Sequence, residues 1–192
     1  CRCGKFYRVI PDWLLFGGSC EKNSALKGNA FTMENFQEYT LRNIQEQDCT
    51  LLKKMARDCG TLDVHTAYTY WVVSRFFADT SFVLCRGSEP VGYIMAIEVP
   101  EGVFIWQIGI LKEYRGKGIS ALLISPVFEA ARRKGANILL SIDEENAASN
   151  AAFRAFCQRQ GLKMETCGDV KLRDAYDPTF SECEKLYCIH IE

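Results

Sequence analysis

The stretch Val103-Phe-Ile-Trp-Gln-Ile-Gly-Ile-Leu-Lys-Glu-Tyr-Arg-Gly-Lys-Gly-Ile-Ser120 decides the fold of this chain. Its first half, residues 103–110, is almost wholly apolar and rich in β-branched residues, which is typical of a strand buried on both faces. A short basic turn with two glycines follows, and after it apolar residues recur at helical spacing. Strand, turn and helix in this order predict an anion site made of backbone N–H groups and a helix N-terminus. The alternative is a basic loop that only turns the chain.

The predicted anion site contains six consecutive residues, Arg115, Gly116, Lys117, Gly118, Ile119 and Ser120. The two glycines allow positive φ and let the backbone approach a ligand closely. The arginine and the lysine add positive charge.

Length and composition narrow the classes of protein. The chain has 192 residues and a net charge of −1, so it suits one domain and nothing favours a nucleic-acid partner. It holds no apolar run of the ~20 residues that span a bilayer. Its ten cysteines are scattered through apolar segments, which favours reduced thiols in the cytoplasm. Cys1 and Cys3 form only half of a zinc knuckle, so we expect no metal.

Residues 1–35 carry Gly, Ser, Asn and Lys without sustained periodicity, and we expect a linker-like extension there. Residues 36–192 are predicted to form the domain. Its fold class is α/β, with a mixed central sheet and helices on both faces. The strands are expected at 38–42, 81–85, 91–99, 103–110, 138–142, 162–167 and 184–191, and the helices at 49–59, 66–78, from 119, and 147–160.

The turn resembles a known signature. Arg115-x-x-Gly118-x-Ser120 is similar to the Q/R-x-x-G-x-G/A motif of the GNAT superfamily of N-acetyltransferases, with Ser120 in place of the usual Gly or Ala. The resemblance implies that acetyl-coenzyme A is the co-substrate and that this loop holds its pyrophosphate. It also implies that Asn146 contacts the coenzyme.

In such folds the buried strand splays from its neighbour and frees backbone N–H groups for the thioester arm. By resemblance, Ile108 and Ile110 flank that break, with Gly109 between them. A glycine inside a strand marks either a bulge or close packing against another element, and both remain open here.

Catalytic groups are harder to assign. Many members place a tyrosine on the later helix to protonate the departing thiolate, and alignment on Gly161 puts Cys157 at that position. A buried structural cysteine is the alternative. Tyr68 is the candidate phenol at the acceptor. The strand 103–110 contains no acid, so the general base is not identified.

Five further motifs, in order, resemble the 2,4-diaminobutyrate acetyltransferases of ectoine biosynthesis over about residues 38–191. They are Leu62-Asp63 with Tyr68-x-Tyr70, Phe77-x-x-Thr80, Phe104-x-Trp106-Gln107, Asn146-x-x-Ser149 and Glu182-x-Glu184-x-Leu186-Tyr187.

The resemblance implies that Asp63, Trp106 and Glu184 bind the acceptor. Asp63 faces the cationic end of the substrate in that family, although an Asp before a helix can also be its cap. Trp106 offers an aromatic face to an ammonium group or simply packs in the core. Glu184 must be paired or exposed on its strand.

The chain departs from the family at His65, Thr66 and Ser181, where the family has Asn, Ser and His. Because these positions belong to the acceptor region, the coenzyme prediction is firmer than the acceptor. We expect transfer of acetyl to the 4-amino group of L-2,4-diaminobutyrate, in a homodimer without membrane partners. Acetylation of another small diamine or amino acid, and a non-enzymatic acyl-CoA sensor, are the alternatives.

Overall fold

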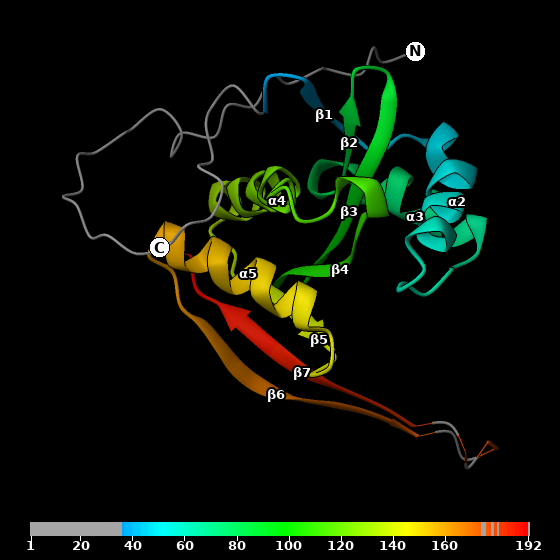
Figure 1. Cartoon of the computed structure of the whole chain (residues 1–192). Helices are drawn as coiled ribbons and strands as arrows, with labels where there is room; N and C mark the ends of the chain where they lie inside the picture. The colour runs from blue at the N-terminus through cyan, green and yellow to red at the C-terminus, as the bar shows by residue number, and fades with distance from the viewer. Residues whose placement is uncertain (1–35, 174–175, 178, 180, 192) are drawn as a thin grey trace.

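Seven strands form one mixed sheet in the order β1-β2-β3-β4-β5-β7-β6 (Figure 1). The computed structural model describes residues 36–173, 176, 177, 179 and 181–191, so the predicted extension at 1–35 lies outside the described residues. Every neighbouring pair is antiparallel except β4 and β5, which run parallel. The strands are β1 Tyr39–Asn43, β2 Phe82–Arg86, β3 Glu89–Val99, β4 Gly102–Ile110, β5 Ile138–Ile142, β6 Met164–Arg173 and β7 Ser181–Ile189.

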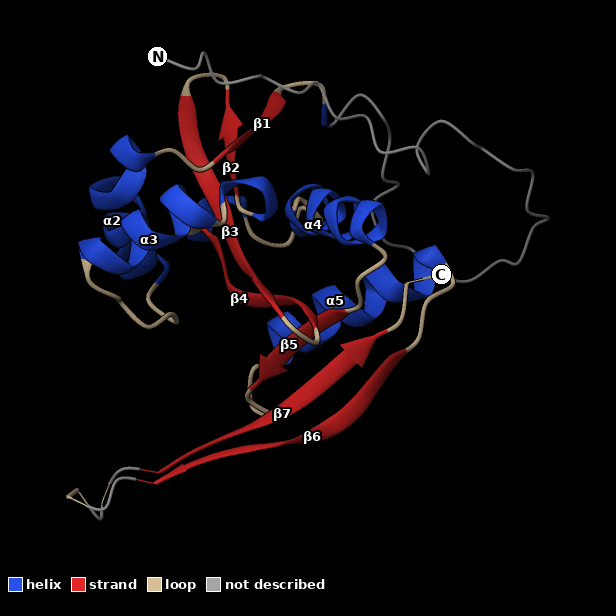
Figure 2. Cartoon of the chain, turned by 180° about the vertical axis from the view of Figure 1, so that it is seen from behind, coloured by secondary structure: helices blue, strands red, loops and turns tan. Residues whose placement is uncertain are grey.

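In the part of the chain that the structure describes, four α-helices cover the sheet, two on each face (Figure 2). They are α2 Cys49–Cys59, α3 Ala67–Phe76, α4 Ser120–Lys134 and α5 Ala147–Gln160, joined by the short 3-10 turns η2 Glu46–Asp48, η3 Ala78–Thr80 and η4 Lys112–Tyr114. The predicted order of strands and helices is confirmed. The hairpin of β6 and β7 is longer than predicted and extends beyond the rest of the sheet (Figure 1). The outer half of β6 alternates, with Val170 and Leu172 between charged residues, but the outer end of β7, Ser181 to Glu184, has no such apolar pattern.

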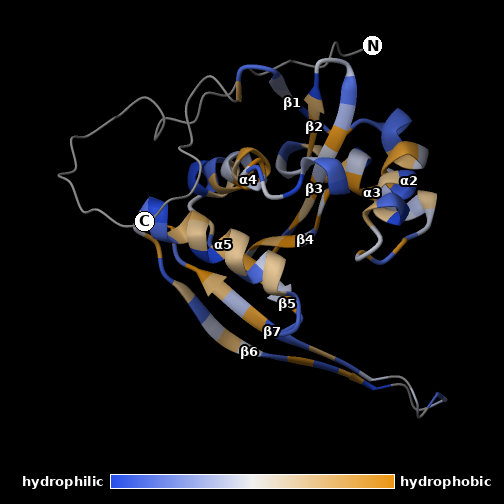
Figure 3. Cartoon of the chain, viewed as in Figure 1, coloured by the Kyte–Doolittle hydropathy of each residue, from blue (hydrophilic) through white to orange (hydrophobic). Residues whose placement is uncertain are grey.

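Each face of the sheet has its own hydrophobic core. One core lies between the sheet and the helices α4 and α5, and it includes Val103 of β4, Leu123 of α4 and Phe153 of α5. The other lies between the sheet and the helices α2 and α3, and it includes Tyr93 and Met95 of β3 and Leu52 of α2. Figure 3 shows that the central strands are largely hydrophobic, whereas the helices carry hydrophobic and hydrophilic residues in alternation.

A β-bulge at Trp106 changes the phase of β4. Met95 of β3 pairs with Gln107 and Ala96 pairs with Ile105, so Trp106 is the extra residue of the pair. Before the bulge, Val103 and Ile105 point into the α4–α5 core, and after it the even-numbered Ile108 and Ile110 do so. Since side chains alternate along a strand, one inserted residue moves the next side chains to opposite faces. Gln107 and Gly109 therefore face α2 and α3.

β4 and β5 part soon after they begin. They share only three residue pairs, ending at Ile105 with Leu140, although β4 continues to Ile110 and β5 to Ile142. Beyond that point the backbone of β4 is paired with β3 on one side only. The splay that the family resemblance implied is therefore present, and it begins three residues before Ile108.

Gly109 is a packing glycine and not the bulge. A Cβ at this position would lie 2.7 Å from Tyr93 Cε1 and 2.9 Å from Leu62 Cδ1, and both neighbours are held in place by the core. Of the two interpretations left open by the sequence, close packing is the correct one.

The substitution Gly109→Ala tests this packing. We expect it to lower the free energy of unfolding by about 1–3 kcal/mol, because the methyl group forces Tyr93 or Leu62 to move. Urea denaturation followed by circular dichroism measures the change. Gly168→Ala is the matched control, since its added Cβ meets nothing nearer than Leu186 Cδ2 at 3.9 Å. Equal stability of the two variants would contradict the packing role.

Candidate active site

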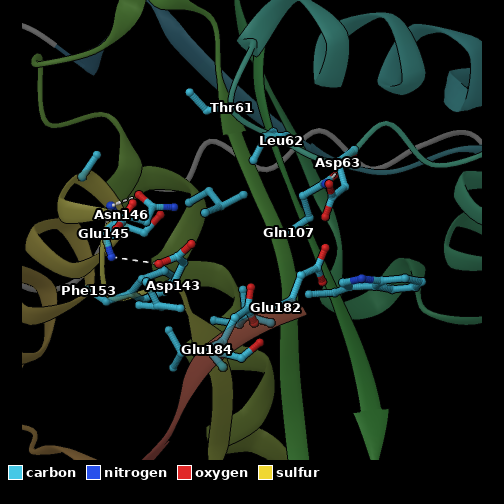
Figure 4. Close-up of a pocket in the computed structure, with 18 of the residues that line it drawn as sticks. Thr61, Leu62, Asp63, Gln107, Asp143, Glu145, Asn146, Phe153, Glu182 and Glu184 are labelled. Atoms are coloured by element: carbon cyan, nitrogen blue, oxygen red, sulfur yellow. Dashed lines mark hydrogen bonds between the residues drawn. The ribbon is translucent and has the colours of Figure 1, made fainter. Parts of the chain in front are cut away.

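A cavity of about 730 Å³ opens where β4 and β5 part (Figure 4). Its walls come from four parts of the chain: the loop after α2, the second half of β4, the end of β5 with the start of α5, and the outer part of β7. In Figure 4, Asp63 and Gln107 lie on one side of this space and Asp143 and Asn146 on the other. The cavity thus exposes a strand edge together with polar and apolar side chains to one ligand.

The loop before α4 has the backbone of an anion site. Gly116 and Gly118 both have φ of 72°, in the left-handed region that glycine favours. Ile119 is the N-cap of α4 and makes no side-chain cap. In the first turn, the N–H groups of Ala121 and Leu122 donate to the carbonyls of Gly118 and Ile119 at 3.2 Å and 3.0 Å, so the donors available to a ligand are the N–H groups that precede them in the loop. A pyrophosphate fits this donor set, because the N–H groups and the positive end of the helix dipole converge there.

Arg115 is held by the protein itself. Its Nε donates a hydrogen bond to the carbonyl of Ile110 at 2.8 Å, and an Nη donates to the carbonyl of Cys59 at 2.8 Å. These bonds fix the loop to the end of β4 and to the end of α2. The side chain therefore anchors the loop, and Lys117, whose Nζ lies 5.1 Å from the ring centre of Tyr114, remains on its surface.

The three predicted acceptor residues meet at one place. Asp63, Trp106 and Glu184 all line the main cavity, and all three also line an adjoining cavity of about 260 Å³. Trp106 is 40% exposed, so its indole is a wall of the site and not part of the core.

Asp63 is free of the capping role that the sequence left open. Thr66 is the N-cap of α3, and its Oγ1 accepts a hydrogen bond from Thr69 N at 3.2 Å. Because Thr66 caps the helix, the Asp63 carboxylate remains available to a ligand in the cavity.

A buried hydrogen-bonded chain positions the Asp63 loop. Tyr93 Oη donates to Gln107 Oε1 at 2.6 Å, and Gln107 Nε2 donates to the carbonyl of Asp63 at 2.9 Å. Burial raises the pKa of Tyr93 well above its ordinary value, so the phenol stays a donor. This fixes which end of the Gln107 amide accepts and which donates.

The two predicted catalytic residues lie away from this cavity. Tyr68 is 70% exposed on α3, where its ring stacks on Trp71 with 5.5 Å between centroids. Cys157 is only 2% exposed, packs in the α4–α5 core, and burial raises its thiol pKa to about 11. Neither is among the residues that line the cavities. The structural interpretation of Cys157 is the one that its position supports.

The remaining predicted coenzyme residues lie at the start of α5 and on β4. Asn146 lines the cavity and caps α5, with its Oδ1 accepting from Ser149 N at 3.1 Å. Ile108 lines the cavity, while the carbonyl of Ile110 is engaged by Arg115 and by the Cys59 thiol. Asp143 also borders the cavity, but its Oδ1 accepts from Glu145 N at 2.9 Å within a turn.

Sequence reasoning did not select Gln107 or Glu182. Both stand inside quoted motifs, one beside Trp106 and the other two residues before Glu184. Period-two spacing along a strand places Glu182 on the same face as Glu184, and that signal was available. The role of Gln107 depends on the phase change at the bulge, which the sequence does not show.

Residues 41–161 match the acetyltransferase (GNAT) family, and the chain belongs to that family. It is an acetyl-CoA-dependent acetyltransferase. It is 35% identical to the L-2,4-diaminobutyric acid acetyltransferase of Streptomyces coelicolor over 124 residues, which cover 62% of this chain and 73% of that protein. The corresponding enzyme of Shouchella clausii is 30% identical over 137 residues, covering 69% and 76%.

Solved structures share the fold. The diaminobutyrate acetyltransferase EctA of Paenibacillus lautus, solved with its substrate L-2,4-diaminobutyric acid and coenzyme A, has a TM-score of 0.69 at 23% identity and covers 80% of this chain and 95% of its own. An N-acetyltransferase from Staphylococcus aureus has a TM-score of 0.60 at 15% identity, covering 80% and 99%.

Two further findings concern the described residues. None of their helices is long and apolar enough to cross a membrane. Within the same part of the chain, no group of three or more His, Cys, Asp or Glu side chains is placed to hold a metal ion.

Gly118→Ala tests the loop. An alanine at φ of 72° strains the backbone, so we expect the Kd of acetyl-CoA to rise about tenfold, measured by isothermal titration calorimetry. Gly161→Ala is the matched control, because Gly161 has φ of 68° at the end of α5 with open space around its Cβ position. If both variants bind acetyl-CoA as the parent does, the loop is not the pyrophosphate site.

Proposed function

We propose that this enzyme transfers the acetyl group of acetyl-CoA to the 4-amino group of L-2,4-diaminobutyrate. The observation that carries the proposal is the meeting of Asp63, Glu182 and Glu184 with the face of Trp106, at the mouth of the gap between β4 and β5. Carboxylates and an aromatic wall suit a small acceptor with two amino groups. The named relatives of this chain support the same acceptor.

The two substrates would approach from different parts of the site. The loop 115–120 would hold the pyrophosphate, and the unpaired edge of β4 around Ile108 and Gly109 would hold the thioester arm. Asn146 would border the coenzyme from the start of α5. Asp63, Trp106 and Glu184 would position the acceptor on the side of β7.

The chemistry requires a neutral amine, because an ammonium group has no lone pair for attack on the thioester. A free alkylamine has a pKa near 10, so the amine must lose its proton in the site. Donors aimed at the developing oxyanion and a proton for the departing thiolate complete the requirement. Backbone N–H groups on the open edge of β4 would supply the donors for the oxyanion.

Steady-state turnover decides between this function and its alternatives. Purified enzyme is assayed with acetyl-CoA and a panel of small amines, and thiol release is followed. We expect L-2,4-diaminobutyrate to have the highest kcat/KM. A better substrate among other diamines or amino acids would change the acceptor, and tight acetyl-CoA binding without any acetylation would favour the sensor interpretation.

Glu184→Gln tests the acceptor site. The change keeps the size of the side chain and removes its charge, so we expect the acceptor KM to rise about tenfold while the Kd of acetyl-CoA stays unchanged. Glu165→Gln on the exposed part of β6 is the control, because Glu165 lines neither cavity. An unchanged acceptor KM in the Glu184 variant would remove this residue from the site.

We also propose that residues 36–192 form the catalytic domain, that it works as a homodimer, and that it functions in the cytoplasm. The seven described cysteines are free thiols, which suits a reducing compartment. On α3, Tyr68 and Phe76 are 70% and 65% exposed, and exposed aromatic side chains on one helix suit an interface.

Analytical ultracentrifugation tests the dimer. We expect the parent to sediment as two chains at micromolar concentration and Phe76→Glu to shift the equilibrium toward one chain, because a charge at the interface lacks a partner. A parent that sediments as a single chain at these concentrations contradicts the proposal.

A further inference from the structure

The acceptor side of the site has an unusual balance of charge. Asp63, Glu182 and Glu184 line both cavities, and Asp143 and Glu145 border the larger one. Among the described residues that line the two cavities, His65 is the only side chain that can carry a positive charge. An amino acid that enters this space brings a carboxylate as well as its amines. That carboxylate needs a donor or a cation among three negative side chains.

The imidazole of His65 is held in a defined place. Its ring centre lies 5.0 Å from that of Trp106, with an angle of 51° between the planes. Tyr70, a fully buried residue of α3, lies 6.1 Å away between ring centres. A histidine that packs against two aromatic rings loses less freedom when a ligand binds than an unsupported one does.

The start of α3 adds to the same effect. His65 directly precedes Thr66, the N-cap of this ten-residue helix. The first turn of a helix carries free N–H groups and the positive end of the dipole, and both favour a nearby anion. His65 is the residue of this segment that lines the smaller cavity, whereas the first turn of α3 does not border it and the Thr69 N–H is already bonded to Thr66. The helix therefore contributes through its dipole alone.

We propose that His65 forms the subsite for the α-carboxylate of the acceptor and so selects an amino acid over a simple diamine. This inference rests on the proposed function and assigns the side chain that recognises the acid group. The imidazole donates a hydrogen bond to the carboxylate, while Asp63, Glu182 and Glu184 receive the amino groups. The substrate then bridges the loop before α3 and the strand β7.

The test compares two acceptors that differ only in the acid group. L-2,4-diaminobutyrate carries a carboxylate, and L-2,4-diaminobutyramide carries a neutral amide in its place. We expect His65→Leu, which removes the donor, to lower kcat/KM for diaminobutyrate about tenfold, as loss of a hydrogen bond to a charged group does. We expect kcat/KM for the amide to change by less than about twofold, because its neutral group has no charge for the imidazole to meet.

His190→Leu is the matched control. His190 is the other histidine of the chain, is exposed after β7, and lines neither cavity. If the amide turns over slowly, its inhibition constant against diaminobutyrate gives the same comparison. The activity of the His65 variant toward the amide also shows that the protein is folded.

Each outcome separates the inference from the function on which it rests. Loss of preference for the acid over the amide in the His65 variant, and not in the His190 variant, supports the subsite. Equal losses for both acceptors make His65 a packing residue, and unchanged values remove it from the site. Absence of acetylation of either acceptor by the parent enzyme instead overturns the proposed function.

Discussion

The parting of β4 from β5 after Ile105 is the constraint on which the site depends. A parallel pair normally satisfies the backbone groups of both strands, and here that pairing stops after three residues. The remaining residues of β4 keep their hydrogen bonds to β3, so the strand stays rigid while its other edge is open. A rigid, open edge inside a sheet is a place where an extended ligand can bind as an additional strand would. The cavity forms at this edge because the sheet cannot close it.

The bulge at Trp106 gives this open strand two different faces. Without it, alternation would carry Gln107 to the α4–α5 side, away from Tyr93 and from the loop that holds Asp63. With it, Gln107 is buried against Tyr93 and reaches the carbonyl of Asp63. One inserted residue thereby links the tryptophan, the amide and the loop before α3. Because the chain of hydrogen bonds is buried, loss of either partner leaves an unsatisfied polar group, and the loop is held accordingly.

The sequence predicts the parts of this protein that depend on local pattern. The buried run of β4, the glycine turn and the helix after it have short-range signals, and the order of elements follows from them. The parting of β4 and β5 and the position of the bulge depend on how the strands pair, which the sequence of one strand does not show. From the sequence alone, Gly109 is therefore a reasonable candidate for the bulge. The outer end of β7, Ser181 to Glu184, carries no apolar pattern that marks it as strand, so the sequence predicts a shorter hairpin, although period-two spacing from Glu184 does place Glu182 on the same face.

The two halves of the site also differ in what builds them. The coenzyme half consists mainly of backbone: two glycines at positive φ, the first turn of α4 and the free edge of β4. Even Arg115 serves there by holding carbonyl groups of the protein. The acceptor half consists of side chains from the loop before α3, from β4 and from β7. Backbone geometry tolerates few substitutions, whereas a side chain at a cavity can change without disturbing the sheet. A short motif can therefore identify the coenzyme, while the acceptor is decided by residues such as His65 that come together only in the folded chain.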